Sequence, residues 1–187
     1  MALSPARRTQ PPLDQERLEE LALRYVAKYA TSGAKLCTYL ARKLRERGWI
    51  GDDGPDLQAL AGRFAQLGYI DDPSYAVTRS RALSARGYGK RRLVETLRRA
   101  GVSEDDSRAA FDAADLEAVD AALRFARRRR LGPFAPQDAD RHQREKWIAA
   151  MIRAGHTFGL ARAIASLAPG AAVDPGELSE TIRLDAN

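Results

Sequence analysis

The sequence predicts an all-α protein made of three tandem three-helix repeats in an elongated, curved array. Two observations predict this fold. Apolar residues recur at the three- and four-residue spacing of amphipathic helices along most of the chain. The helix-ending glycines Gly48, Gly101 and Gly155 lie 53 and 54 residues apart, and apolar residues precede them at matched positions. Such a near-constant period is typical of units that complete their cores by stacking on their neighbours.

The composition limits the kind of protein. The chain has 187 residues, 44% of them hydrophobic, which suits one or two globular domains. Residues 1–12 lack the apolar stretch of a secretory signal, and no run approaches the roughly 18 apolar residues that suggest a membrane span. Cys37 is the single cysteine, which excludes an internal disulfide and suits a reducing compartment. We therefore expect a cytoplasmic protein without a membrane partner. We also expect a monomer, because the sequence pattern gives no reason to expect a larger assembly.

Charge is distributed in blocks. The net charge is +6, from 31 basic and 25 acidic residues. Residues 72–101 hold eight basic and two acidic residues, residues 102–120 hold one and seven, and residues 121–130 hold five arginines and no acid. These blocks favour a positive face on packed helices, which would suit nucleic acid or an acidic protein surface. The alternative is a set of solvated helix faces.

Residues 1–13 contain three prolines among polar residues, and we expect a disordered arm. The first repeat then spans residues 14–68. Thr31-Ser32 is expected to cap its second helix, which ends at Gly48, and Gly68 ends its third. The apolar stripes of the three helices are Leu18, Leu21, Ala22, Tyr25 and Tyr29; Leu36, Leu40 and Leu44; and Leu57, Leu60, Ala61, Phe64 and Leu67.

The second repeat spans residues 69–114. Asp71 or Asp72 caps its first helix, Gly87-Tyr88-Gly89 separates the first helix from the second, and Ser103 caps a short third helix through Phe111. The predicted buried residues are Tyr75, Ala76, Ala82 and Leu83 in the first helix and Leu93, Val94, Leu97 and Ala100 in the second. The opposite side of the second helix carries Arg91, Arg98 and Arg99.

The third repeat spans residues 115–168, and residues 169–187 are expected to be a disordered acidic tail. The first helix of this repeat ends in a run of four arginines, residues 127–130, and Leu131–Gln137 forms its longest loop. The predicted stripes are Leu116, Val119, Leu123 and Ala126; Trp147, Ile148, Met151 and Ile152; and Phe158, Leu160, Ala161, Ile164 and Leu167.

Residues for catalysis or metal binding are scarce. His142 falls on a polar helix face, while His156 directly follows a helix-ending glycine and is expected to pack. With a single cysteine and no cluster of histidines and acids, a zinc site is not expected. The Asp52-Asp53 and Asp71-Asp72 pairs are more simply helix caps than metal ligands. No phosphate-binding loop and no nucleophile with its base is visible, so we expect a binding protein without a cofactor or metal, not an enzyme.

Several motifs resemble the RecX family of bacterial recombination regulators. The similar residues are Gly68-Tyr69-Ile70-Asp71-Asp72, Tyr75-Ala76, Arg86-Gly87-Tyr88-Gly89, Arg91-Arg92-Leu93, and Leu97 with Gly101-Val102-Ser103. The stretch from Lys146-Trp147-Ile148 through Gly155, Phe158 and Arg162 is similar to the third repeat of the family. The resemblance covers roughly residues 16–167, and the combination of the first motif with Arg-Gly-Tyr-Gly is its most specific part.

This resemblance implies three tandem three-helix repeats and a protein that binds the RecA recombinase filament along its groove. It also implies inhibition of the ATP hydrolysis, strand exchange and co-protease activities of RecA, together with weak binding to single- or double-stranded DNA. We expect the contact face to consist of basic residues of the second and third repeats. They are Arg79, Arg81, Arg86, Lys90, Arg91, Arg98, Arg99, Arg124, Arg127 and Arg128. The alternative is that some of them only pair with the acidic segment 103–115.

A second functional class is a helix-turn-helix-like regulator that acts directly on duplex DNA, since a basic helix of a three-helix unit can enter the major groove. A sequence-specific reader needs Asn, Gln and Arg gathered on one recognition helix. This chain has one asparagine, Asn187, at its last position, and its arginines are spread over several helices. The pattern therefore favours contact with a protein surface or a phosphate backbone.

Overall fold

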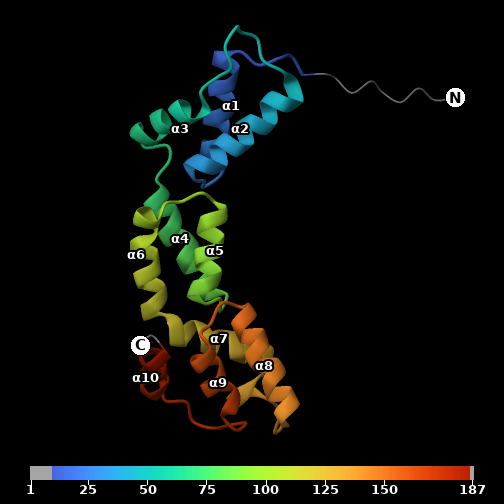
Figure 1. The fold of residues 1–187 in the computed structure, drawn as a ribbon, viewed down its shortest axis with the longest axis vertical. Helices are drawn as coiled ribbons and strands as arrows, with labels where there is room; N and C mark the ends of the chain where they lie inside the picture. The colour runs from blue at the N-terminus through green and yellow to red at the C-terminus, as the bar shows by residue number, and fades with distance from the viewer. Residues whose placement is uncertain (1–9, 186–187) are drawn as a thin grey trace, which may run out of the picture. The chain divides into compact units, whose positions relative to one another are not determined.

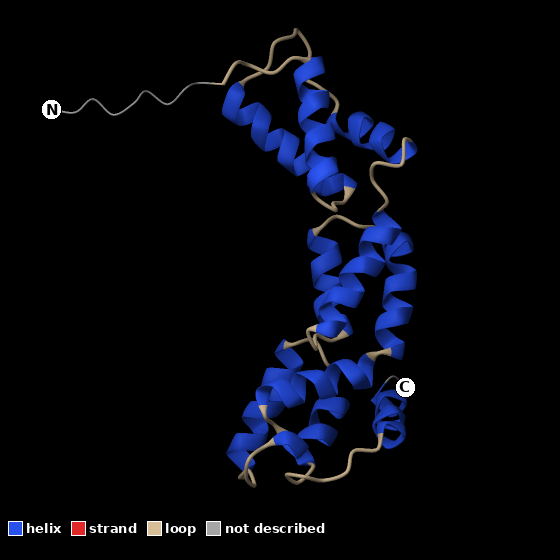
Figure 2. Cartoon of the chain, turned by 180° about the vertical axis from the view of Figure 1, so that it is seen from behind, coloured by secondary structure: helices blue, strands red, loops and turns tan. Residues whose placement is uncertain are grey.

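The fold is that of a computed structural model, which describes residues 10–185 (Figure 1). These residues form ten α-helices and one short 3-10 helix joined by loops, without a β-strand among them (Figure 2). The predicted all-α class is therefore confirmed. The chain divides into two compact units: the first reaches to Tyr75 and includes Ala100–Val102, and the second holds Ala76–Arg99 and the chain from Ser103 onward.

The first unit contains α1 (Gln15–Lys28), α2 (Gly33–Arg47) and α3 (Leu57–Gln66). Each begins where a side-chain oxygen accepts a backbone N–H of the first turn, from Asp14, Ser32 and Asp56 respectively. Asp56 thus caps α3, and the predicted Asp52-Asp53 pair lies in the loop before it. The core combines residues of the three helices with the segments that flank them; its fully buried members are Leu13, Leu18, Ala22, Leu36 and Leu40.

The end of the expected disordered arm is part of this core. Residues 1–9 of that arm lie outside the described residues. Leu13, however, is completely buried, and its backbone exchanges hydrogen bonds with Gly48 and Ile50 at 3.0 and 2.7 Å. The expectation of disorder is wrong for this residue. Burying the leucine side chain in the core provides a favourable free energy that the polar, proline-rich residues before it do not provide.

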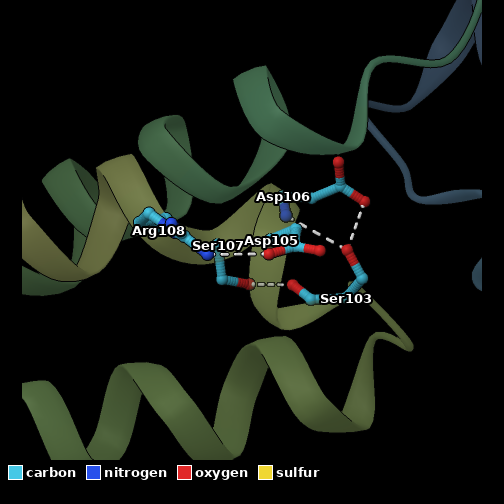
Figure 3. A network of polar contacts seen from close by, with 5 residues as sticks. All are labelled: Ser103, Asp105, Asp106, Ser107 and Arg108. Carbon is cyan, nitrogen blue, oxygen red and sulfur yellow. Dashed lines mark hydrogen bonds and ion pairs between the residues drawn. The ribbon is translucent and has the colours of Figure 1, made fainter.

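The middle of the chain forms α4 (Asp72–Ala85), α5 (Lys90–Arg99) and α6 (Glu104–Leu116). The Ser103 hydroxyl accepts the N–H of Asp106 at 3.1 Å, as the sequence predicted for a cap, and its carbonyl accepts the Ser107 hydroxyl at 2.7 Å (Figure 3). An ion pair between Asp105 and Arg108, 2.8 Å apart, closes the same turn. This helix continues beyond the predicted end at Phe111, so the expected repeat boundary at residues 114/115 falls inside it.

The buried side of α4 differs from the prediction. Tyr75 and Ala76 are buried as expected, but Ala82 is exposed, and Ser80 and Ser84 are buried instead. The Ser80 hydroxyl donates to the carbonyl oxygen of Ala110 in α6, 3.1 Å away. The Ser80 hydroxyl therefore links α4 to α6 by a hydrogen bond, and an apolar stripe cannot reveal this kind of helix contact.

The chain continues with α7 (Ala118–Arg129), the 3-10 turn η1 (Gly132–Phe134), α8 (Arg141–Arg153) and α9 (Phe158–Ser166). Their core includes Val119, Phe125, Met151, Leu160 and Ile164. Leu116, predicted to begin the stripe of this repeat, is 89% exposed at the end of α6. The prediction is wrong because Glu117 separates α6 from α7, and Leu116 belongs to α6, whose buried face is different.

The expected disordered tail contains a further helix, α10 (Pro175–Asp185), which contacts α7 and α9. Leu178 is 6% exposed and belongs to the same core as Phe125 and Ile164. The Asp174 carboxylate accepts the N–H of Gly176 at 2.7 Å at the start of the helix. The prediction of disorder is thus wrong for residues 175–185, because one buried leucine within an acidic segment leaves no periodic signal.

An equivalent turn-to-turn contact occurs twice. Ser32, at the start of α2, donates its hydroxyl to the carbonyl oxygen of Ala100, in the turn between α5 and α6. Gly89, before α5, donates its N–H to the carbonyl oxygen of Ala154, in the turn between α8 and α9, at 3.0 Å. Both acceptors directly precede helix-ending glycines of the predicted repeat. The correspondence extends the repeat from the sequence to the packing of its turns.

Candidate functional site

The predicted contact residues all lie in the second unit. Arg79 and Arg81 are on α4, and Arg86 is in the turn that follows. Lys90, Arg91, Arg98 and Arg99 are on α5, and Arg124, Arg127 and Arg128 are on α7. These residues do not form one uniform face. Their side chains fall into three groups with different surroundings.

The first group carries uncompensated charge. Arg79, Arg81, Arg91 and Arg98 are exposed, and the described residues provide no carboxylate within ion-pair distance of them. Arg99 is similar, with Glu95 at 3.8 Å, and an exposed pair of that length contributes little. These guanidinium groups on α4 and α5 remain available to an outside partner.

The second group is already engaged within the protein. The ammonium group of Lys90 lies 2.5 Å from the Asp115 carboxylate and 5.7 Å from the centre of the Phe111 ring. Arg124 donates to the carbonyl oxygen of Ser84 at 3.0 Å and lies 3.6 Å from Glu117. Both side chains therefore link helices of the unit. Lys90 pairs with the acidic segment 103–115, which was the alternative to a role in the contact face.

The third group surrounds aromatic rings. The guanidinium carbons of Arg86 and Arg128 lie 5.5 and 5.8 Å from the centre of the Tyr88 ring, and Arg128 also donates to the carbonyl oxygen of Arg86. Arg127 lies 4.9 Å from the centre of the Phe134 ring. Such contacts hold a guanidinium group in place while leaving its positive charge unneutralised.

Beside this third group lies a hollow of about 470 Å³, which we call the arginine hollow. It is lined by Tyr88, Phe125, Arg128, Arg129, Ala150, Arg153 and Ala154. Arg129 and Arg153 were not among the predicted contact residues. Arg129 continues the arginine run of α7, which was a usable signal. Arg153 is at the end of α8, and no spacing along the sequence shows that it meets α7.

The Gly87-Tyr88-Gly89 turn positions Tyr88 at this hollow. Gly87 has a φ of 72°, and a Cβ atom there would lie 2.7 Å from the backbone nitrogen of Phe125. A Cβ at Gly89 would lie 2.7 Å from the backbone nitrogen of His156. Both glycines are therefore required because the turn passes directly against α7 and the α8–α9 turn.

His156 has the packing role that the sequence suggested. It is 3% exposed, its Nε2 lies 3.1 Å from the carbonyl oxygen of Gly87, and its ring meets that of Phe125 edge to face at 5.7 Å. Burial lowers its pKa to about 4, so the imidazole is uncharged at neutral pH. It supports the wall of the hollow without adding to its charge.

Among the described side chains, which end at residue 180, no group of three or more His, Cys, Asp or Glu residues is arranged to hold a metal ion. None of the helices described is long and apolar enough to cross a membrane.

Comparisons with known proteins give a consistent result. No protein-family model matches the chain. The chain is 32% identical over 155 residues to regulatory protein RecX of Myxococcus xanthus, covering 79% of this chain and 83% of that protein. It is 29% identical to regulatory protein RecX of Halorhodospira halophila, covering 82% and 89%. The fold matches a crystal structure of RecX from Lactobacillus salivarius with a TM-score of 0.58, over 80% of this chain and 92% of that one at 17% identity.

Proposed function

The chain belongs to the RecX family of regulatory proteins, and on that basis we propose that it binds the RecA–DNA filament and inhibits RecA. Inhibition would extend to ATP hydrolysis, strand exchange and co-protease action, as the family resemblance implies. It would take place in the cytoplasm and require no reaction catalysed by this chain, because occupying the filament surface is enough to hinder its partner.

The observation that supports this proposal is the uncompensated charge on α4 and α5. Arg79, Arg81, Arg91 and Arg98 project from two neighbouring helices with no carboxylate partner among the described residues. Guanidinium groups form forked hydrogen bonds with both carboxylates and phosphates. A filament that combines a protein surface with nucleic acid offers both kinds of acceptor.

The local structure also explains how these arginines are held. Leu93 and Leu97 anchor α5 with exposed fractions of 2% and 1%. Arg91 and Arg98 lie outside this buried stripe and are exposed. In α4, the Ser80 hydroxyl donates a hydrogen bond to the carbonyl oxygen of Ala110 and so links this helix to α6. The charges therefore lie on rigid helices, which lowers the entropy lost on binding compared with a flexible basic tail.

The test is single-stranded-DNA-dependent ATP hydrolysis by the cognate RecA, with this protein titrated in. Loss of hydrolysis well below one copy per RecA would support the proposal and indicate a block of filament growth. Loss only near saturation would also support it, and would favour coating of the groove or competition for DNA. Unchanged hydrolysis at saturation would contradict the proposal. If tight sequence-selective duplex binding accompanied that result, the helix-turn-helix-like DNA regulator would be the better function.

A further inference from the structure

We propose that the arginine hollow is a binding site for the phosphodiester backbone of a nucleic-acid strand, with Arg129 and Arg153 as contact residues. The inference deepens the proposed function, because a RecA–DNA filament contains such a strand. It rests on a part of the second unit separate from the arginines of α4 and α5. Its test uses DNA without RecA, so that its failure can be distinguished from a failure of the proposed function.

The arginine hollow carries uncompensated positive charge. Three guanidinium groups, those of Arg128, Arg129 and Arg153, line the hollow, and no carboxylate does. Within the described part of the chain, none of the three forms an ion pair, whereas Arg108 and Arg141 each pair with a carboxylate at 2.8 and 2.9 Å. Positive charges gathered on one concave surface without compensation repel each other, and a bound anion relieves that repulsion.

Two of the arginines that line the hollow are held in place by neighbouring groups. Arg128 lies 5.7 Å from the centre of the Phe125 ring as well as against Tyr88, and it donates to a backbone carbonyl. The guanidinium carbon of Arg129 lies 5.9 Å from the centre of the same Phe125 ring. Phe125 is 4% exposed and therefore fixed in the core. The aromatic contacts restrict these arginines before the ligand arrives, which reduces the ordering cost of binding.

The lining of the hollow suits a phosphate backbone better than an acidic protein segment. Protein partners are usually anchored by apolar or aromatic side chains placed in pockets. Apart from its arginines, the hollow is lined by Ala150, Ala154 and the rings of Tyr88 and Phe125. Guanidinium groups already lie over both rings, so they offer little to an apolar anchor, and large exposed apolar residues such as Phe158 lie elsewhere. Positive charge also continues past the hollow to Arg86 and Arg127, which suits a ligand with a regularly repeated negative charge.

The experiment measures binding of a fluorescently labelled oligodeoxythymidine by anisotropy over a range of salt concentrations, without RecA. The test variant is R129Q/R153Q, and the matched control is R108Q/R141Q, which also removes two exposed arginines. For single strands the logarithm of affinity falls with that of salt by roughly 0.7 per phosphate contact. The test variant should therefore lose about 1.4 from this slope and bind roughly ten-fold or more weakly at about 0.1 M salt. The control should keep the slope of the parent protein.

Two further measurements control for loss of the fold and for loss of charge. Thermal unfolding followed by circular dichroism checks that both variants keep the parent fold, as expected for exposed side chains. R129K/R153K keeps the charge but loses the planar fork, and it should retain the salt slope with a lower affinity. A parent slope and affinity in R129Q/R153Q would overturn the proposal. So would displacement of the oligonucleotide by inorganic phosphate beyond the effect of chloride at equal ionic strength, because the site would then prefer a free anion.

Discussion

The buried imidazole of His156 lies 3.1 Å from the carbonyl oxygen of Gly87. A carbonyl oxygen can only accept a hydrogen bond, so Nε2 carries the proton and the neutral ring needs that tautomer. The contact joins the α8–α9 turn to the turn before α5, where Gly89 donates to Ala154. Gly87, Gly89, Gly155 and the histidine thus form one junction, and this junction supports the wall of the arginine hollow.

This histidine should make stability depend on pH. Its pKa is about 4 in the folded protein, against 6.5 for an unperturbed imidazole, so the unfolded chain binds more protons between these values. The free energy of unfolding should therefore fall by about 3 kcal/mol as pH is lowered from 6.5 to 4. Chemical denaturation over this range measures it. H156Q keeps an amide donor but does not titrate, so its free energy of unfolding should fall by about 3 kcal/mol less than that of the parent over this range. Equal decreases in the two proteins would contradict this role of His156.

Gly89→Ala should destabilise the protein by about 3 kcal/mol, because the added methyl group would collide with the backbone of Gly155 and His156. Urea denaturation followed by circular dichroism measures the loss. The control is Gly62→Ala in α3, where a Cβ atom meets nothing within 4 Å. That change should stabilise the helix by roughly 0.5–1 kcal/mol. If both substitutions were neutral, the close approach of the two turns would not exist in solution.

Leu178→Ala should cost about 2–3 kcal/mol in unfolding free energy, since it removes a buried side chain between α10 and the core of the second unit. Glu180→Ala changes an exposed position of the same helix and should cost less than about 0.5 kcal/mol. Thermal and urea unfolding provide both values. Equal stability of the Leu178 variant and the parent would mean that the segment is the disordered tail that its composition suggested.

The sequence predicted the helical class, the caps at Ser32 and Ser103, and the glycines that end the helices, because these depend on local periodicity and hydrogen bonding. It did not reveal the burial of Ser80 and Ser84, which depends on tertiary packing and not on a local apolar stripe. The burial of Leu178 was missed for the same reason.

The candidate site shows a similar division. The basic residues of α4, α5 and α7 were visible as charge blocks, but the pairing of Lys90 with Asp115 depends on how α5 and α6 pack. Arg153 could not be associated with Tyr88 from sequence, because the two meet only where the end of α8 packs against the Gly87-Tyr88-Gly89 turn. Local patterns thus identify the charged helices, and tertiary packing decides which charges remain available.

The most direct test of the central claim is RecA inhibition by a charge-reversed protein. The variant R79E/R81E/R98E/R127E reverses four exposed arginines that have no carboxylate partner among the described residues. Its control reverses four exposed arginines that do pair with carboxylates, R24E/R42E/R108E/R141E. The measurement is DNA-dependent ATP hydrolysis by RecA at equal concentrations of each variant. The account predicts that the first variant no longer inhibits while the control still does; full inhibition by the first variant, folded like the parent, would contradict it.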